Sequence, residues 1–127
     1  MAELFTRVAR CGRGATALEF AFVAPPLLLL LVGTLDAGRL LWADAALHDA
    51  AARAARCIAV TPQACRTQRA ITATALDSAT APALAGARFG VTRGACGAVV
   101  MARLPFRSLL PLPRRVVPVL RAKVCVP

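Results

Sequence analysis

A largely apolar run over residues 15–35 constrains this chain more than any other feature. Its 21 residues would span about 31 Å as an α-helix, close to the thickness of the hydrocarbon core of a bilayer. One carboxylate, Glu19, lies near the start of the run, five residues after Gly14. Because a charge inside a membrane costs free energy, a carboxylate placed there indicates a function. The run predicts a single membrane-spanning helix.

Charged residues differ between the two flanks of this run. Cytoplasmic flanks of membrane helices carry an excess of Lys and Arg. The distribution therefore predicts a cytoplasmic N-terminus, with the rest of the chain on the other side of the membrane. Three arginines precede the run, and a mixture of acidic and basic residues follows it: Arg7, Arg10 and Arg13 before, and Asp36, Arg39, Asp44 and Asp49 after.

A cleaved secretory signal, cut near residues 43–45, is the competing interpretation of this region. The helical pattern continues through those residues, and Glu19 lies inside the apolar boundary. Pro25 and Pro26 also fall in the middle of the run rather than near the cut. These features favour a membrane helix. The two prolines remove backbone donors, so we expect them to kink or loosen it.

Helical periodicity continues beyond the membrane run to about residue 60, since apolar residues recur on one side at spacings of three, four and seven. Pro62 ends this helix. A second, shorter helix is predicted over residues 65–79, followed by a connection over residues 81–86.

The period then changes to two, which is typical of half-buried antiparallel strands. Pro118 places the last strand at an edge of the sheet. The predicted class is α+β, with a long N-terminal membrane-spanning helix that continues into a small external domain containing a second helix and a three-stranded antiparallel sheet. The strands are expected at 88–92, 98–106 and 116–126, with a turn at 93–97 and a proline-rich loop at 108–115.

The five cysteines agree with this orientation. Cys11 precedes the run, on the reducing side, and the other four follow it, where disulfides persist. Four cysteines allow three connectivities. We favour one bond that closes a short loop around Thr61 and Pro62 and one that ties the 93–97 turn to the last strand, namely Cys57–Cys65 and Cys96–Cys125.

The net charge of +10 could attract anionic lipid or nucleic acid. Nucleic acid is not expected, because the basic residues are scattered singly, tyrosine is absent and no recognised motif occurs. The sequence also lacks a C-x-x-C pair, a phosphate-binding glycine loop and a nucleophile elbow. We therefore expect no catalytic site, metal, cofactor or small-molecule substrate.

A leader that ends in glycine, a glutamate at the fifth following residue and an apolar helix together resemble the type IV pilin superfamily. The segment Gly14-Ala15-Thr16-Ala17-Leu18-Glu19-Phe20 looks like the tight-adherence (Tad/Flp) branch. The long Ala/Arg-rich helix and the cysteine-bearing sheet resemble the TadE-like minor pilins, or pseudopilins. Phe20 departs from the tyrosine usual in Flp pilins, and Pro25-Pro26 departs from a single proline.

The resemblance implies a role in the biogenesis or initiation of a Tad-type adhesion pilus. A prepilin peptidase would cut between Gly14 and Ala15, and Glu19, with Phe20 beside it, would pair with the freed amine during assembly. The implied parts are a cytoplasmic leader (1–14), a transmembrane and amphipathic helix (15–60) and a disulfide-stapled periplasmic domain (61–127). The implied partners are the inner membrane, other pilin subunits and the Tad secretion machinery. The alternative is an unprocessed single-pass inner-membrane protein whose periplasmic domain binds a partner.

Overall fold

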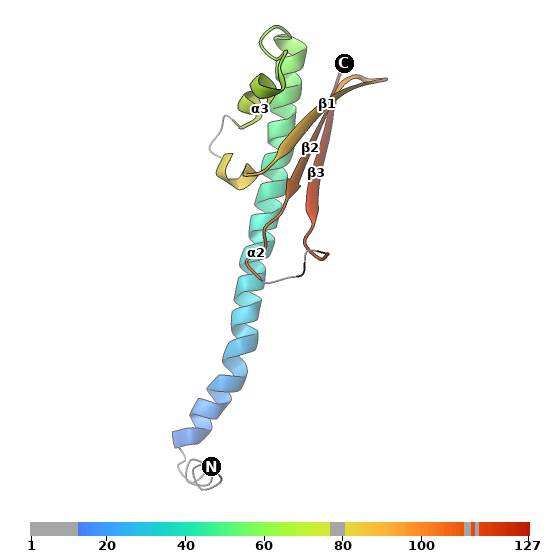
Figure 1. The fold of residues 1–127 in the computed structure, drawn as a ribbon. Coiled ribbons are helices and arrows are strands. Elements are labelled where there is room, and N and C mark those ends of the chain that lie inside the picture. Colours follow the sequence, from blue (N-terminus) through green and yellow to red (C-terminus); the bar gives the residue numbers. More distant parts are fainter. Residues whose placement is uncertain (1–12, 77–80, 111–112, 114) are drawn as a thin grey trace. The chain divides into compact units, whose positions relative to one another are not determined.

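The computed structural model describes residues 13–76, 81–110, 113 and 115–127, with side chains from Thr16 onward. Among these described residues, two helices, a short 3-10 helix and three strands confirm the predicted α+β class (Figure 1). The chain divides into two units, Met1–Leu35 and Asp36–Pro127, and the helix α2 contributes to both. The elements are α2 (Arg13–Val60), α3 (Gln68–Leu76), η1 (Ala81–Leu84), β1 (Arg88–Gly94), β2 (Gly97–Pro105) and β3 (Val119–Val126).

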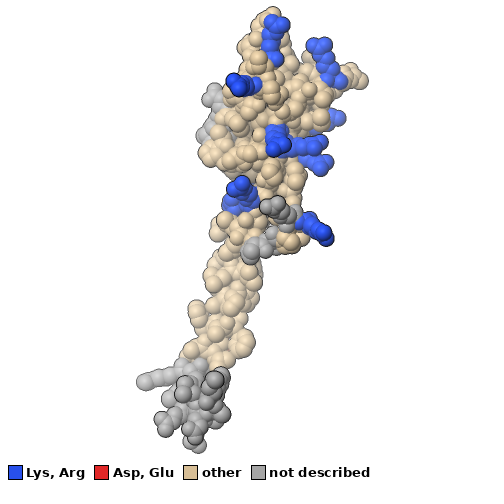
Figure 2. Space-filling model, in the orientation of Figure 1, with Lys and Arg blue, Asp and Glu red and all other residues tan. Residues whose placement is uncertain are grey.

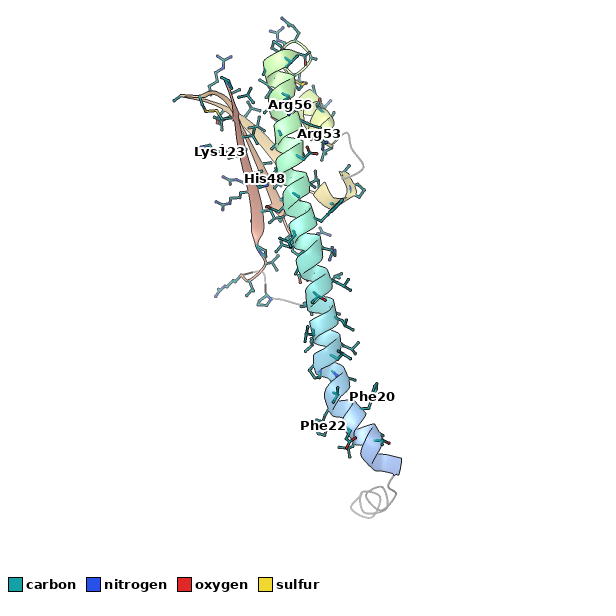
Figure 3. All side chains as sticks on the ribbon, turned by 180° about the vertical axis from the view of Figure 1, so that it is seen from behind. Phe20, Phe22, His48, Arg53, Arg56 and Lys123 are labelled. Carbon is teal, nitrogen blue, oxygen red and sulfur yellow. A yellow bond between two sulfur atoms is a disulfide. The ribbon has the colours of Figure 1, made fainter. Side chains whose placement is uncertain are left out.

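In the first unit, α2 exposes its apolar side chains on all sides. An 18-residue window has a mean hydropathy of 2.0 and none of it is buried, so α2 is long and apolar enough to cross a membrane. Phe20 and Phe22 project from this part of the helix, about three-quarters exposed (Figure 3). Pro25 and Pro26 lie inside α2, and the helix continues through both. A helix that is apolar all round requires an apolar solvent or neighbouring helices.

In the second unit, β2 lies between β1 and β3 in an antiparallel sheet, so the predicted edge position of the last strand is confirmed. One sheet face and α2 share a hydrophobic core. The helix contributes Leu47 and four fully buried alanines, whose small side chains leave room for close approach. The fully buried alanines are Ala50, Ala51, Ala54 and Ala55, and the sheet contributes Phe89, Val100, Ala102, Leu104 and Ala122.

The second helix begins at Gln68, so the prediction that it starts at Cys65 is wrong. Thr67 sets the start, because its Oγ1 accepts a hydrogen bond from the Ala70 amide at 3.2 Å, as an N-cap does. Cys65 lies in the preceding turn, where its amide donates to the Thr61 carbonyl. The predicted end near Ala79 lies outside the described residues. The Gln68 side-chain amide joins α3 to β1 by donating to the Phe89 carbonyl.

The last strand begins at Val119 rather than at residue 116. The Val116 amide donates to the Pro113 carbonyl at 2.9 Å in a turn, and Pro118 has no amide to offer the sheet. The 93–97 turn is also tighter than predicted, since β1 extends to Gly94 and pairs with Gly97 at the start of β2. Part of the predicted 81–86 connection is the 3-10 helix η1.

Gly97 makes this tight turn possible. Its φ of +109° is disfavoured for L-residues, and an added Cβ would lie 2.4 Å from the Val126 carbonyl oxygen. Gly97→Ala is expected to lower the free energy of unfolding by about 1–3 kcal/mol. Gly90→Ala is the matched control, because its Cβ would meet nothing closer than 3.9 Å. Thermal unfolding of the full chain in detergent measures both, and an equal loss would contradict this account.

Three arginines line up across the outer face of the sheet. Arg103 pairs in register with Arg88 on one side and with Arg121 on the other, and all three are exposed. Lys123 also lies on the side of β3 that faces away from α2 (Figure 3). Like charges opposite one another destabilise a sheet. On the face shown in Figure 2, Lys and Arg side chains gather over the unit Asp36–Pro127.

Removing the central arginine of this row should stabilise the sheet. Arg103→Thr is expected to raise the free energy of unfolding by about 0.2–1 kcal/mol at low ionic strength, because it relieves two cross-strand repulsions. The gain should shrink in high salt, which screens exposed charges. Arg93→Thr, opposite Ala98, is the control. Thermal unfolding at two salt concentrations tests this, and an equal gain in the control would exclude the repulsion as its cause.

Candidate processing and assembly site

The predicted site residues lie in the first turns of α2. The helix begins at Arg13, so Gly14 and Ala15 belong to its first turn, and Glu19 and Phe20 to the next. Residues four apart occupy the same face of a helix, about 6 Å apart along its axis. The backbone nitrogen of Ala15 and the carboxylate of Glu19 therefore lie on one face of α2, one turn apart.

Glu19 is exposed, and within the described part of the chain its carboxylate has no hydrogen bond or ion pair. Several residues around it on the helix are apolar and exposed, namely Leu18, Phe20, Phe22 and Val23. A carboxylate in such surroundings is stable in a bilayer only if water or an opposite charge reaches it. The site can therefore accept a cation supplied by a new chain terminus or by another molecule.

The structure places the four cysteines that follow the apolar run at disulfide distance, in the two pairs that the sequence favours. Cys57 and Cys65 are bonded with Cα atoms 6.0 Å apart, and Cys96 and Cys125 with Cα atoms 6.3 Å apart. The first bond links the end of α2 to the turn before α3. The second links the β1–β2 turn to β3. Cys11 lies outside the described residues.

The structure adds a site that sequence reasoning missed, around the carboxylate of Asp36. This residue is only 8% exposed. The Ser108 hydroxyl donates to it, the Leu109 amide donates to both oxygens at 3.1 and 3.0 Å, and the Arg39 guanidinium pairs with it at 3.0 Å. We call Asp36, Arg39, Ser108 and Leu109 the Asp36 latch. It holds the segment after β2 against α2.

The Asp36 latch makes stability depend on pH. The hydrogen bond from Ser108 lowers the pKa of Asp36 below its ordinary value of 3.8, and the Leu109 and Leu110 amides and Arg39 act in the same direction against the opposing effect of burial. A carboxyl whose pKa is lowered on folding stabilises the fold above its unfolded pKa and loses that contribution as pH falls through its folded pKa.

We therefore expect Asp36→Asn to lower the melting temperature at pH 7 and to have a smaller effect below about pH 3.8. Thermal unfolding of the full chain between pH 2 and pH 7 measures this difference. Asp44→Asn is the control, since the Asp44 side chain on the same helix is 45% exposed and only His48, at 3.6 Å, pairs with it. If the two variants shared one pH profile, the latch would not be the source of the dependence.

Among the described residues, no group of three or more His, Cys, Asp or Glu side chains could hold a metal ion. The lone histidine, His48, lies on α2, where it contacts the Asp44 carbonyl oxygen at 3.0 Å. Arg53 pairs with Asp49 at 2.7 Å on the same helix. The ion pairs in which both members are described residues join neighbours on α2.

These features define a class of chain with one candidate membrane anchor and a small disulfide-bonded α+β unit. Residues 14–56 match the family model described as TadE-like protein, which confirms the predicted resemblance over those residues. The match begins at Gly14, includes Glu19 and ends at Arg56 on α2. The four cysteines that follow the apolar run and the whole sheet lie outside it. No curated protein and no solved structure matches the chain.

Proposed function

We propose that this chain is a minor pilin, or pseudopilin, that helps to initiate or anchor a Tad-type (Flp) pilus and has no enzymatic activity. The observation that carries the proposal is the exposed carboxylate of Glu19, five residues after Gly14, at the start of an apolar helix inside the TadE-like match. The apolar part of α2 would anchor the chain in the inner membrane, with the disulfide-bonded unit in the periplasm.

Cleavage after Gly14 would explain why a carboxylate lies at the start of the apolar helix. A prepilin peptidase that cuts after Gly14 reaches a backbone without a side chain and leaves an amine on Ala15. That amine and the Glu19 carboxylate lie on one helix face. Within a filament or an initiation complex, the amine of one subunit pairs with Glu19 of itself or of a neighbour, which offsets the desolvation of both charges and fixes the axial register.

Intact-mass measurement of the chain from cells that contain the prepilin peptidase tests the proposal. The expected mature chain begins at Ala15. Gly14→Val should retain residues 1–14, whereas Gly12→Val, the matched control, should still be cut. A native chain that keeps its leader in such cells contradicts the proposal and favours an unprocessed single-pass membrane protein with a partner-binding periplasmic domain.

A further inference from the structure

The segment that follows β2 is held at the end of the apolar run. Asp36 is the first residue after that run and the first residue of the second unit. The Asp36 latch binds Ser108 and Leu109, which are more than 70 residues away in sequence. Figure 1 shows the chain returning to α2 after β2. If the run crosses the membrane, this segment lies where the helix leaves the hydrocarbon.

This segment exposes apolar and basic side chains together. Leu109 is 58% exposed although its own amide is fixed by the latch. Arg107 is exposed, and the structure shows no acidic partner for it among the described residues. In the turn that leads back to β3, Val116 is 61% exposed and Arg115 is exposed as well. Exposed aliphatic tips beside cations are typical of surfaces that lie in a membrane interface.

Backbone contacts hold this surface in place. The Phe106 amide donates to the Pro118 carbonyl, which joins the outgoing and returning chain. The Leu110 amide donates to the Ser108 hydroxyl at 3.1 Å, and Arg39 lies 5.7 Å from the centre of the Phe106 ring. These contacts fix the direction of Leu109 without covering it. An anchored apolar tip loses little conformational entropy when it inserts.

Charge and depth favour a bilayer as the occupant. Arg107 and Arg115 complement anionic lipid phosphates, and each basic residue near such a surface strengthens the attraction. Trp42 lies six residues beyond Asp36, about 9 Å along the helix, and is 64% exposed. Tryptophan is enriched at this depth, where its ring meets the headgroups. Trp42 on α2 and the arginines of the segment are therefore side chains of the kinds that lie in the headgroup layer of a bilayer.

We propose that residues 106–110 sit on the membrane surface, with Leu109 inserted among the headgroups and Arg107 paired with the phosphates of anionic lipids. We call residues 106–110 in this position the membrane seat. The seat fixes the height and the rotation of the external unit relative to the bilayer. The inference rests on the proposed membrane anchor, and it is independent of cleavage and of pilus assembly.

Depth-dependent fluorescence quenching tests the seat on the full chain in vesicles of phosphatidylcholine and phosphatidylglycerol with brominated acyl chains. In a Trp42→Phe background, Leu109→Trp provides a single indole at the seat, and Thr92→Trp provides one at the hairpin end of β1. We expect a blue-shifted emission and at least twofold stronger quenching for position 109. Equal quenching at the two positions would overturn the proposed insertion.

A second comparison tests the lipid contact. Adding Arg107→Glu to the position-109 reporter should reduce its quenching in vesicles that contain phosphatidylglycerol and leave it unchanged in phosphatidylcholine alone. Arg93→Glu, an equal charge change at the β1–β2 turn, should have no effect. Equal effects of the two variants would overturn pairing with anionic lipid. Alkaline extraction of the same vesicles tests the anchor separately, because a chain that washes off contradicts the proposed span rather than the seat.

Discussion

Glu19→Ala is expected to leave cleavage after Gly14 intact and to abolish assembly of the chain into Tad pili or their initiation complex. The peptidase acts on the backbone four to five residues away, so the loss of this carboxylate need not affect the cut. Assembly differs, because it would bury the Ala15 amine without its partner. Removing one member of a buried ion pair costs about 3–5 kcal/mol, which corresponds to a more than hundredfold weaker association.

Two measurements on the same cells separate these steps. Intact mass reports the cut, and counts of surface pili, together with co-purification of other pilin subunits, report assembly. Glu19→Gln should resemble Glu19→Ala, since it keeps the size of the side chain and loses the charge. Asp44→Ala removes a carboxylate from α2 beyond the apolar run and should assemble normally. Normal piliation in both Glu19 variants would show that this carboxylate merely reaches water at the interface.

Features governed by local periodicity could be predicted from the sequence. The apolar run, the long helix and the alternation in β2 and β3 give the elements, their order and the core face of the sheet, because helix and strand present side chains with fixed periods. Val100, Ala102 and Leu104 are buried as the alternation predicts. The spacing of Gly14 and Glu19 is equally local, since both residues lie on α2, and the roles assigned to them stay predictions.

Features that depend on one side chain meeting a distant one could not be predicted. The sequence shows that Asp36 follows the apolar run. It does not predict the hydrogen bond from Ser108, because that bond spans 72 positions and depends on the fold of the sheet. Val99 shows the same limit. Alternation places it on the outer face, and yet it is 6% exposed, opposite the disulfide-bonded Cys125 in register. The starts of α3 and β3 also differ from the prediction, because a single residue decides each: the N-cap Thr67 for α3 and Pro118 for β3.

The disulfides should contribute unequally to stability. In the chain-entropy description, a crosslink stabilises by restricting the unfolded chain, and the effect grows with the loop that it closes. Cys96 and Cys125 are separated by 29 residues, and Cys57 and Cys65 by 8. The double variant Cys96→Ala/Cys125→Ala should therefore lose about 3.6 kcal/mol of unfolding free energy, and Cys57→Ala/Cys65→Ala about 2.5 kcal/mol.

The larger loss is expected for Cys96–Cys125, the pair that joins the β1–β2 turn to the edge strand β3. Denaturant unfolding of the full chain in detergent, without reductant, measures both variants, and their order is the decisive result. Addition of reductant should lower the stability of the parent chain toward that of a variant lacking all four cysteines and leave that variant unchanged. A parent chain that is insensitive to reductant, or a larger loss for the shorter loop, would show that packing around Cys57 and Cys65 outweighs loop closure in holding this unit together.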